Sequence, residues 1–96
     1  MSPNNKKKLN LIRVKLDKLD NLLLALIKKR TLLVNEVVKL KEYKKEIIDK
    51  ERINSILKKI KGKSKKLNID HRITNRIWKN MIWSYIDYEK RNFKKK

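Results

Sequence analysis

The sequence predicts an all-α protein of three helices, the first much longer than the other two. Apolar residues between Leu9 and Lys41 recur at alternating steps of three and four, which places them on one side of a helix. Glycine and proline occur once each in 96 residues, whereas the turns of a β-sheet domain would require more of both. The composition therefore disfavours a β-sheet fold and favours a helical one.

The first predicted helix runs from Leu9 to about Tyr43, and residues 1–8 before it are expected to form a disordered basic N-terminal tail. Arg30 interrupts its apolar stripe, and a charge there is costly unless an anion meets it. Two interpretations are open: a polar residue that sets the register of a coiled coil, or a binding site inside a helical bundle. The stripe consists of Leu9, Ile12, Leu16, Leu19, Leu23, Leu26, Leu33, Val37 and Leu40.

The second predicted helix follows a short connector at Lys44–Ile48 and begins after Asp49, a residue type that caps helix N-termini. Gly62 lies in a lysine-rich stretch that weakens the second half of this helix. Asn68 is predicted to end it, because asparagine tolerates the left-handed backbone conformation. Its apolar face consists of Ile53, Ile56, Leu57, Ile60 and Leu67.

The third predicted helix is capped by Asp70 and frays into a basic segment from Lys90 onward. His71, the only histidine, has no second ligand or base near it in the sequence and is interpreted as uninvolved in chemistry. The helical domain is predicted to span residues 9–93, with a basic C-terminal tail at 94–96. One stripe of the helix holds Ile73, Ile77, Met81, Ser84 and Tyr88, and its apolar face is widened by Trp78, Ile82, Tyr85 and Ile86.

The net charge of +19 attracts anionic ligands but identifies none, because the lysines are spread along the whole chain. The absence of cysteine excludes a disulfide framework and a cysteine-ligated zinc site. Since no apolar run reaches membrane-spanning length, a cytoplasmic protein is expected. An arginine in so lysine-rich a chain is typical of a site that grips carboxylates with its planar fork. The arginines are Arg13, Arg30, Arg52, Arg72, Arg76 and Arg91.

The length of the first helix predicts both a dimer and the geometry of an anion site. Its apolar stripe is too long for the two later helices of one chain to cover, so a homodimer is expected. Lys41 follows Arg30 by about 16 Å along the helix, at nearly the same angle, so both could hold one small anion. Arg13 precedes Arg30 by about 25 Å and could reach that anion only from a partner chain.

A set of spaced motifs extends through all three predicted helices. They are Leu11-Ile12-Arg13, Leu19-Asp20, Leu23-Leu24-Ala25-Leu26-Ile27-Lys28-Lys29-Arg30, Val37-Val38-Lys39-Leu40-Lys41, Asp49-Lys50-Glu51-Arg52, Ile73-Thr74 and Ile82-Trp83-Ser84. Their combined spacing resembles the all-helical chorismate mutases over about residues 9–90.

The resemblance implies an intertwined homodimer with two active sites that rearranges chorismate to prephenate, toward phenylalanine and tyrosine. It implies no cofactor and no metal, because the reaction is unimolecular and pericyclic. Carried over by position, Arg30 and Arg52 would hold the carboxylates of chorismate, together with Arg13 of the other chain.

The resemblance also implies roles around the reacting bond. Lys41 would donate to the ether oxygen, while Asp49 and Ser84 would fix the ring and its hydroxyl or carboxylate. Tyr88 stands where the family has Gln or Glu, and its phenol can also donate to the ether oxygen. Ile53 stands where the family has Glu, which removes an acceptor expected to contact the substrate hydroxyl.

Several alternatives remain open from the sequence. Asp49 is also explained as an N-cap, Ser84 as a small residue at a helix crossing, and Arg52 as a solvated charge. The lost Glu makes isochorismate pyruvate lyase, a sister reaction on the same scaffold, an alternative to chorismate mutase. A non-enzymatic basic helical module that binds nucleic acid or protein is the third, although the even spread of lysines argues against nucleic acid.

Overall fold

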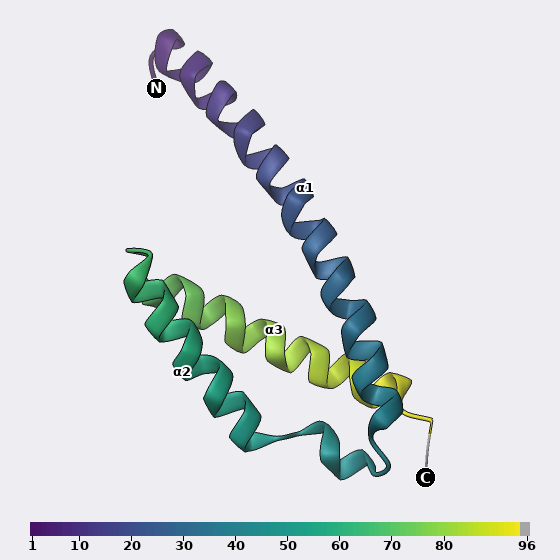
Figure 1. Ribbon diagram of the computed structural model, residues 1–96. Helices are drawn as coiled ribbons and strands as arrows, with labels where there is room; N and C mark the ends of the chain where they lie inside the picture. The colour runs from purple at the N-terminus through teal and green to yellow at the C-terminus, as the bar shows by residue number, and fades with distance from the viewer. Residues whose placement is uncertain (95–96) are drawn as a thin grey trace. The chain divides into compact units, whose positions relative to one another are not determined.

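The computed structural model describes residues 1–94, which contain helices and no strand (Figure 1). The predicted all-α fold of three helices with a long first one is therefore confirmed over this range. The chain consists of two compact units, Met1–Leu33 and Val34–Lys96. None of the helices in residues 1–94 is long and apolar enough to cross a lipid bilayer. The elements are α1 (Pro3–Leu40), the 3₁₀ helix η1 (Lys44–Ile47), α2 (Lys50–Lys66) and α3 (His71–Asn92).

The start of α1 lies at Pro3, six residues before the predicted start, so residues 3–8 are helical and the expected disordered lead-in is wrong there. Ser2 and Pro3 explain the early start. The Ser2 hydroxyl accepts a hydrogen bond from the Asn5 N–H at 3.2 Å, as an N-cap does. Proline suits the first helical position, because its missing N–H would have no partner there.

The end of α1 lies at Leu40, earlier than the predicted end at Tyr43, and the predicted connector contains η1. Glu46 explains this break, since its carboxylate accepts from the Tyr43 N–H at 3.1 Å while its own N–H donates to the Tyr43 carbonyl at 3.0 Å. The break turns Ile47 into the interior, where it is 3% exposed.

The predicted ends of α2 and α3 are confirmed at three positions. The Asp49 carboxylate accepts from the Arg52 N–H at 3.0 Å, and the Asp70 carboxylate accepts from the Arg72 N–H at 2.9 Å. Asn68 has a φ of 56° in the turn after α2, as predicted for a left-handed residue. α3 stays helical to Asn92, so the fraying predicted from Lys90 is not observed. The predicted C-terminal tail is residues 94–96, and its residues 95–96 lie outside the described residues.

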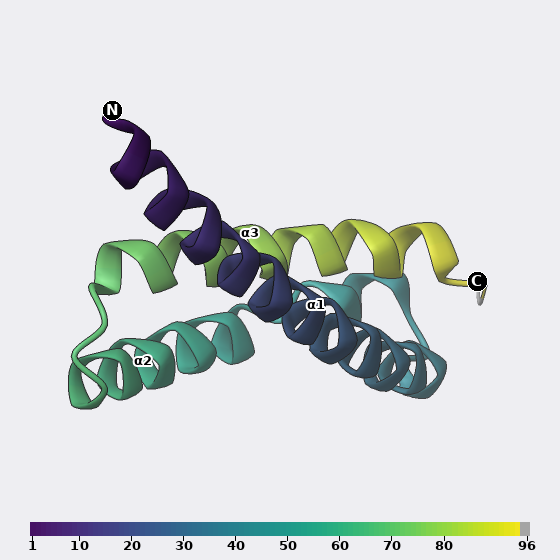
Figure 2. The same ribbon diagram turned by 90° about the horizontal axis from the view of Figure 1, so that it is seen from above.

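The second unit is built on the α2–α3 hairpin, whose two helices pack against each other and are joined by a short turn (Figure 2). Its core consists of buried Ile47, Ile82 and Ile86, against which Ile53, Ile56, Leu57 and Phe93 pack. The buried side of α3 is therefore the face expected only to widen the apolar stripe. Ile73 and Ile77 of the expected main stripe are 56% and 52% exposed.

A pair of buried hydroxyls also joins α2 to α3. Ser64 lies in the lysine-rich part of α2 yet is 3% exposed, and its Oγ lies 2.8 Å from Oγ1 of Thr74. Each hydroxyl has a second partner, since Ser64 donates to the Ile60 carbonyl and Thr74 lies within reach of the His71 carbonyl. The pair satisfies polar groups that would otherwise be buried without partners.

The first unit is the N-terminal part of α1. Its apolar side chains remain exposed in the single chain, which is unusual for so many large apolar residues on one helix. The exposed fractions lie between 47% and 67% for Leu11, Ile12, Val14, Leu16, Leu19, Leu22, Leu23, Leu24, Leu26, Ile27, Leu32 and Leu33.

Candidate active site

Lys41 is the first residue after α1 and lies in the second unit. The prediction that it continues the same helix as Arg30 is wrong, because α1 ends at Leu40. Its backbone N–H donates to the Val38 carbonyl at 3.3 Å, which closes the last turn. The position of its side chain is therefore set by its neighbours in the second unit and not by helical periodicity.

The ammonium group of Lys41 forms an ion pair with Glu89 of α3. Lys41 Nζ lies 3.0 Å from Oε1 of Glu89, and the two side chains are 18% and 9% exposed. Charges so far removed from water are tolerated only when they are paired and hydrogen-bonded, so each side chain depends on the other. Removal of one partner would leave the other buried and unpaired.

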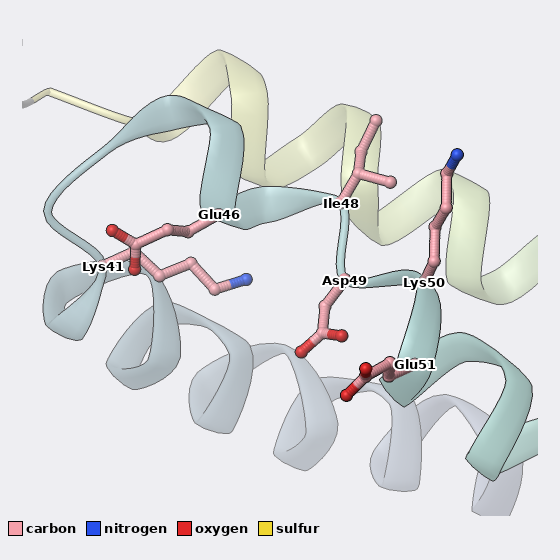
Figure 3. A pocket seen from close by; sticks show the side chains of 6 residues that line it. All are labelled: Lys41, Glu46, Ile48, Asp49, Lys50 and Glu51. Carbon is pink, nitrogen blue, oxygen red and sulfur yellow. The ribbon is translucent and has the colours of Figure 1, made fainter.

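A pocket of about 510 Å³ opens beside Lys41, between the end of α1 and the start of α2. Two of the predicted site residues, Lys41 and Asp49, line it. Figure 3 shows the Lys41 side chain extending toward Asp49 across this space. The remaining lining residues are Glu46, Ile48, Lys50 and Glu51, so the pocket combines two ammonium groups with three carboxylates.

Asp49 lies at the N-cap of α2, where its carboxylate accepts from the Arg52 N–H. This hydrogen bond to Oδ1 accounts for an aspartate at the N-cap position. The carboxylate also faces the pocket (Figure 3). The structure thus confirms Asp49 as an N-cap and shows that it also lines the pocket, while its contact with a ligand stays a prediction.

The capping role gives a prediction about stability. Asp49→Ala should lower the free energy of unfolding by about 1 kcal/mol, whereas Asp49→Asn should leave it almost unchanged because asparagine caps equally well. Urea denaturation at one fixed protein concentration measures both changes. Asp70→Ala is the matched control, because it removes the corresponding cap of α3 at 2.9 Å from Arg72 N, at a residue outside the pocket lining. An unchanged midpoint for Asp49→Ala would refute the capping role.

Tyr88 is held by a side chain that the sequence did not single out. Its hydroxyl donates to Oδ1 of Asn35 at 2.7 Å, which joins α3 to the last turns of α1. The ring also makes an edge contact with Tyr85 and lies below the Arg91 guanidinium. A phenol has one proton to donate, and in this structure Tyr88 donates it to Asn35.

The other predicted residues of the second unit have simpler surroundings. Ser84 is exposed, and its hydroxyl donates to the Asn80 carbonyl one turn earlier at 2.7 Å. Arg52 is exposed in the first turn of α2. Ile53, which follows it, packs against the buried isoleucine cluster of the core. An apolar residue at this position is thus explained by packing.

Arg13 and Arg30 lie on α1 in the first unit. Arg13 is exposed and Arg30 is partly buried. Because the helix is continuous between them, they are about 25 Å apart along its axis, as the sequence predicted. Side chains this far apart on one helix cannot meet at one small ligand.

Sequence reasoning missed Glu89 and Asn35, although a signal for Glu89 was present. Ile82, Ile86, Glu89 and Phe93 follow one another at steps of four, three and four, so the carboxylate interrupts an apolar stripe. Arg30 was recognised in α1 by the same kind of interruption. Asn35 carried no such signal, because its contact with Tyr88 joins residues 53 positions apart.

Comparison with known proteins identifies the family of this chain. The family model for chorismate mutase type II matches residues 12–90, a range that contains all of the predicted site residues. Searches of curated proteins and of solved structures gave no match.

Proposed function

The chain belongs to the chorismate mutase type II family, and from that premise we propose that it rearranges chorismate to prephenate, on the route to phenylalanine and tyrosine. The observation that carries the proposal is the largely buried Lys41 ammonium beside the pocket that Asp49 also lines. Both residues lie within the matched range.

The reaction asks two things of a protein. A flexible dianion must be held in its compact reactive shape, which cationic side chains do by fixing its carboxylates. Negative charge that develops on the ether oxygen as the C–O bond breaks must be stabilised by a donor already in place. Lys41 provides that donor in the proposal, because its side chain is 18% exposed and its ammonium group is already held by a hydrogen bond.

The remaining roles follow the resemblance residue by residue. Arg30 and Arg52 bind the carboxylates of chorismate, joined by Arg13 of the partner chain. These arginines suit the task because each offers two parallel N–H donors to a carboxylate.

Three residues of the second unit complete the proposed site. Asp49 and Ser84 fix the ring and its hydroxyl or carboxylate. Tyr88 donates to the ether oxygen, for which its hydroxyl must leave Oδ1 of Asn35, its partner at 2.7 Å. Binding of substrate is therefore coupled to the exchange of one hydrogen bond.

We further propose an intertwined homodimer. The exposed apolar side chains of the first unit support it, since a row of large apolar residues 47–67% exposed is stable in water when a second chain covers it. The 25 Å between Arg13 and Arg30 supports it independently, because one small ligand can contact both side chains only if two chains contribute.

Isochorismate pyruvate lyase is the second candidate, and Ile53 favours it. The family Glu at this position is expected to accept from the substrate hydroxyl, and Ile53 packs in the core and has no acceptor. A site without that acceptor discriminates less between two substrates that differ in the position of the hydroxyl.

The direct test is to incubate purified protein with chorismate and to follow the fall in its absorbance with identification of the product. Prephenate is the expected product, and the enzyme should turn over chorismate faster than isochorismate. Pyruvate released from isochorismate, without prephenate from chorismate, would replace the proposal with the lyase. Absence of turnover with both substrates would refute both.

A further inference from the structure

Glu89 is a carboxylate on the buried side of α3 to which the proposed reaction assigns no part. The residue is 7% exposed and follows Ile82 and Ile86 on one side of the helix. A carboxylate removed from water in this way is destabilising unless an opposite charge replaces the lost hydration. The structure gives it Lys41 Nζ at 3.0 Å.

The ammonium group of Lys41 in turn requires a partner that fixes its position. It lies beyond the last residue of α1, and its flexible four-carbon chain permits many positions of the ammonium group. Three other carboxylates line the same pocket and are alternative acceptors for this group, namely Glu46, Asp49 and Glu51 (Figure 3). Glu89 on α3 fixes one of these possible positions of the ammonium group through its ion pair with Lys41.

We propose that Glu89 is a positioning residue that holds the ammonium group of Lys41 where the ether oxygen of chorismate arrives. It acts through Lys41 and does not contact the substrate. Two of the three ammonium protons of Lys41 remain for other acceptors when one is donated to Glu89. This inference rests on the proposed function, because it concerns the donor in that reaction.

Substitutions of Glu89 test the inference through the separate responses of kcat and KM. Glu89→Gln keeps an acceptor for Lys41 but removes the negative charge that holds the ammonium group, so kcat should fall about three- to tenfold, the range expected when one hydrogen bond is weakened. Glu89→Ala should lower kcat further. KM should not rise in either variant, because loss of a negative charge favours a dianionic substrate. An unchanged kcat in both folded variants would overturn the inference.

Asp87 provides the matched control on the same helix. Its carboxylate pairs with Arg91 at 3.0 Å, and the two side chains are 70% and 65% exposed. Asp87→Asn therefore removes an equal charge close to Glu89 without touching Lys41, and kcat should stay at the parental value. Circular dichroism and urea denaturation establish how much of each variant is folded, and Glu89→Gln decides the outcome if Glu89→Ala does not fold.

A double-mutant cycle distinguishes a positioning residue from one that contacts the substrate. In a Lys41→Gln background, Glu89→Gln should change kcat less than about twofold, because the residue through which Glu89 acts is gone. A further loss as large as in the parental background would show that Glu89 contributes independently, and would overturn the inference.

A labelling experiment separates this inference from the proposed function. With a limiting amount of an amine-acylating reagent and peptide mass spectrometry, Lys41 should be modified more slowly than exposed Lys44. Glu89→Ala should accelerate modification of Lys41, and Asp87→Asn should not. An active enzyme whose Lys41 labelling ignores Glu89 would refute the inference alone. A protein inactive toward chorismate, with the labelling as expected, would refute the proposed function while the ion pair stands.

Discussion

Lys41→Ala should lower kcat for chorismate by about 10²–10³-fold, which corresponds to roughly 3 kcal/mol of lost transition-state stabilisation. The reason is that the proposed site then has no cation at the ether oxygen when negative charge develops there. KM should change much less than kcat, because the ether oxygen carries little charge in the ground state. Steady-state kinetics over a range of chorismate concentrations measures both constants.

Stability has to be controlled in this experiment, because Lys41→Ala leaves the Glu89 carboxylate buried and unpaired. The double variant Lys41→Met/Glu89→Gln removes both charges while keeping similar volumes, so it should fold and remain as inactive. Lys59→Ala, an exposed residue on α2, is the matched control for the loss of one lysine, and its kcat should be parental. Near-parental turnover by folded Lys41→Ala would refute the assigned role.

Mixing two inactive variants should restore activity if the site is shared between chains. Arg13→Ala and Arg30→Ala homodimers should each be nearly inactive, because every site lacks one carboxylate-binding arginine. When the two proteins are unfolded together and refolded, about half of the dimers should be mixed by random pairing. One site of a mixed dimer receives both alanines and the other both arginines, so the mixture should recover about a quarter of parental activity.

Two controls make the mixing experiment decisive. Parental protein taken through the same unfolding and refolding gives the reference activity. Sedimentation velocity should show dimers in every sample, and a folded stable monomer at micromolar concentration would refute the homodimer. Mass spectrometry of differently tagged chains confirms the exchange, after which lack of recovery would mean that Arg13 serves its own chain or no site.

The helix ends show what sequence can predict in this chain. Asp49, Asp70 and Asn68 were predicted correctly because a cap or a left-handed residue acts on a backbone group a few positions away. The start of α1 is set just as locally. Ser2 followed by Pro3 is a cap signal that would have predicted it, but the signal was not used. Its end at Leu40 was missed: the hydrogen bonds between Tyr43 and Glu46 at the break are local, but the burial of Ile47 that goes with them depends on other helices.

The candidate site shows which contacts could not be predicted from the sequence. The family motif named Lys41 and Asp49, and both line one pocket, because their spacing in the chain is short. Glu89 and Asn35 lie 48 and 53 positions from their partners, so no local pattern pairs them. The buried face of α3 was misjudged for the same physical reason. Its choice between Ile73 and Ile82 is made by contact with η1 and α2, not by periodicity within the helix.

The Lys41–Glu89 pair has a consequence for how this chain tolerates mutation over time. Basic residues number 29 in this chain, and what distinguishes Lys41 from the exposed ones is a carboxylate on a distant helix. Surface lysines can therefore be gained or lost with little effect on the site. A further Asp or Glu near residues 42–48, where Glu42 and Glu46 already lie, is expected to be more disruptive if it reaches the ammonium group, because it then offers Lys41 an acceptor other than Glu89.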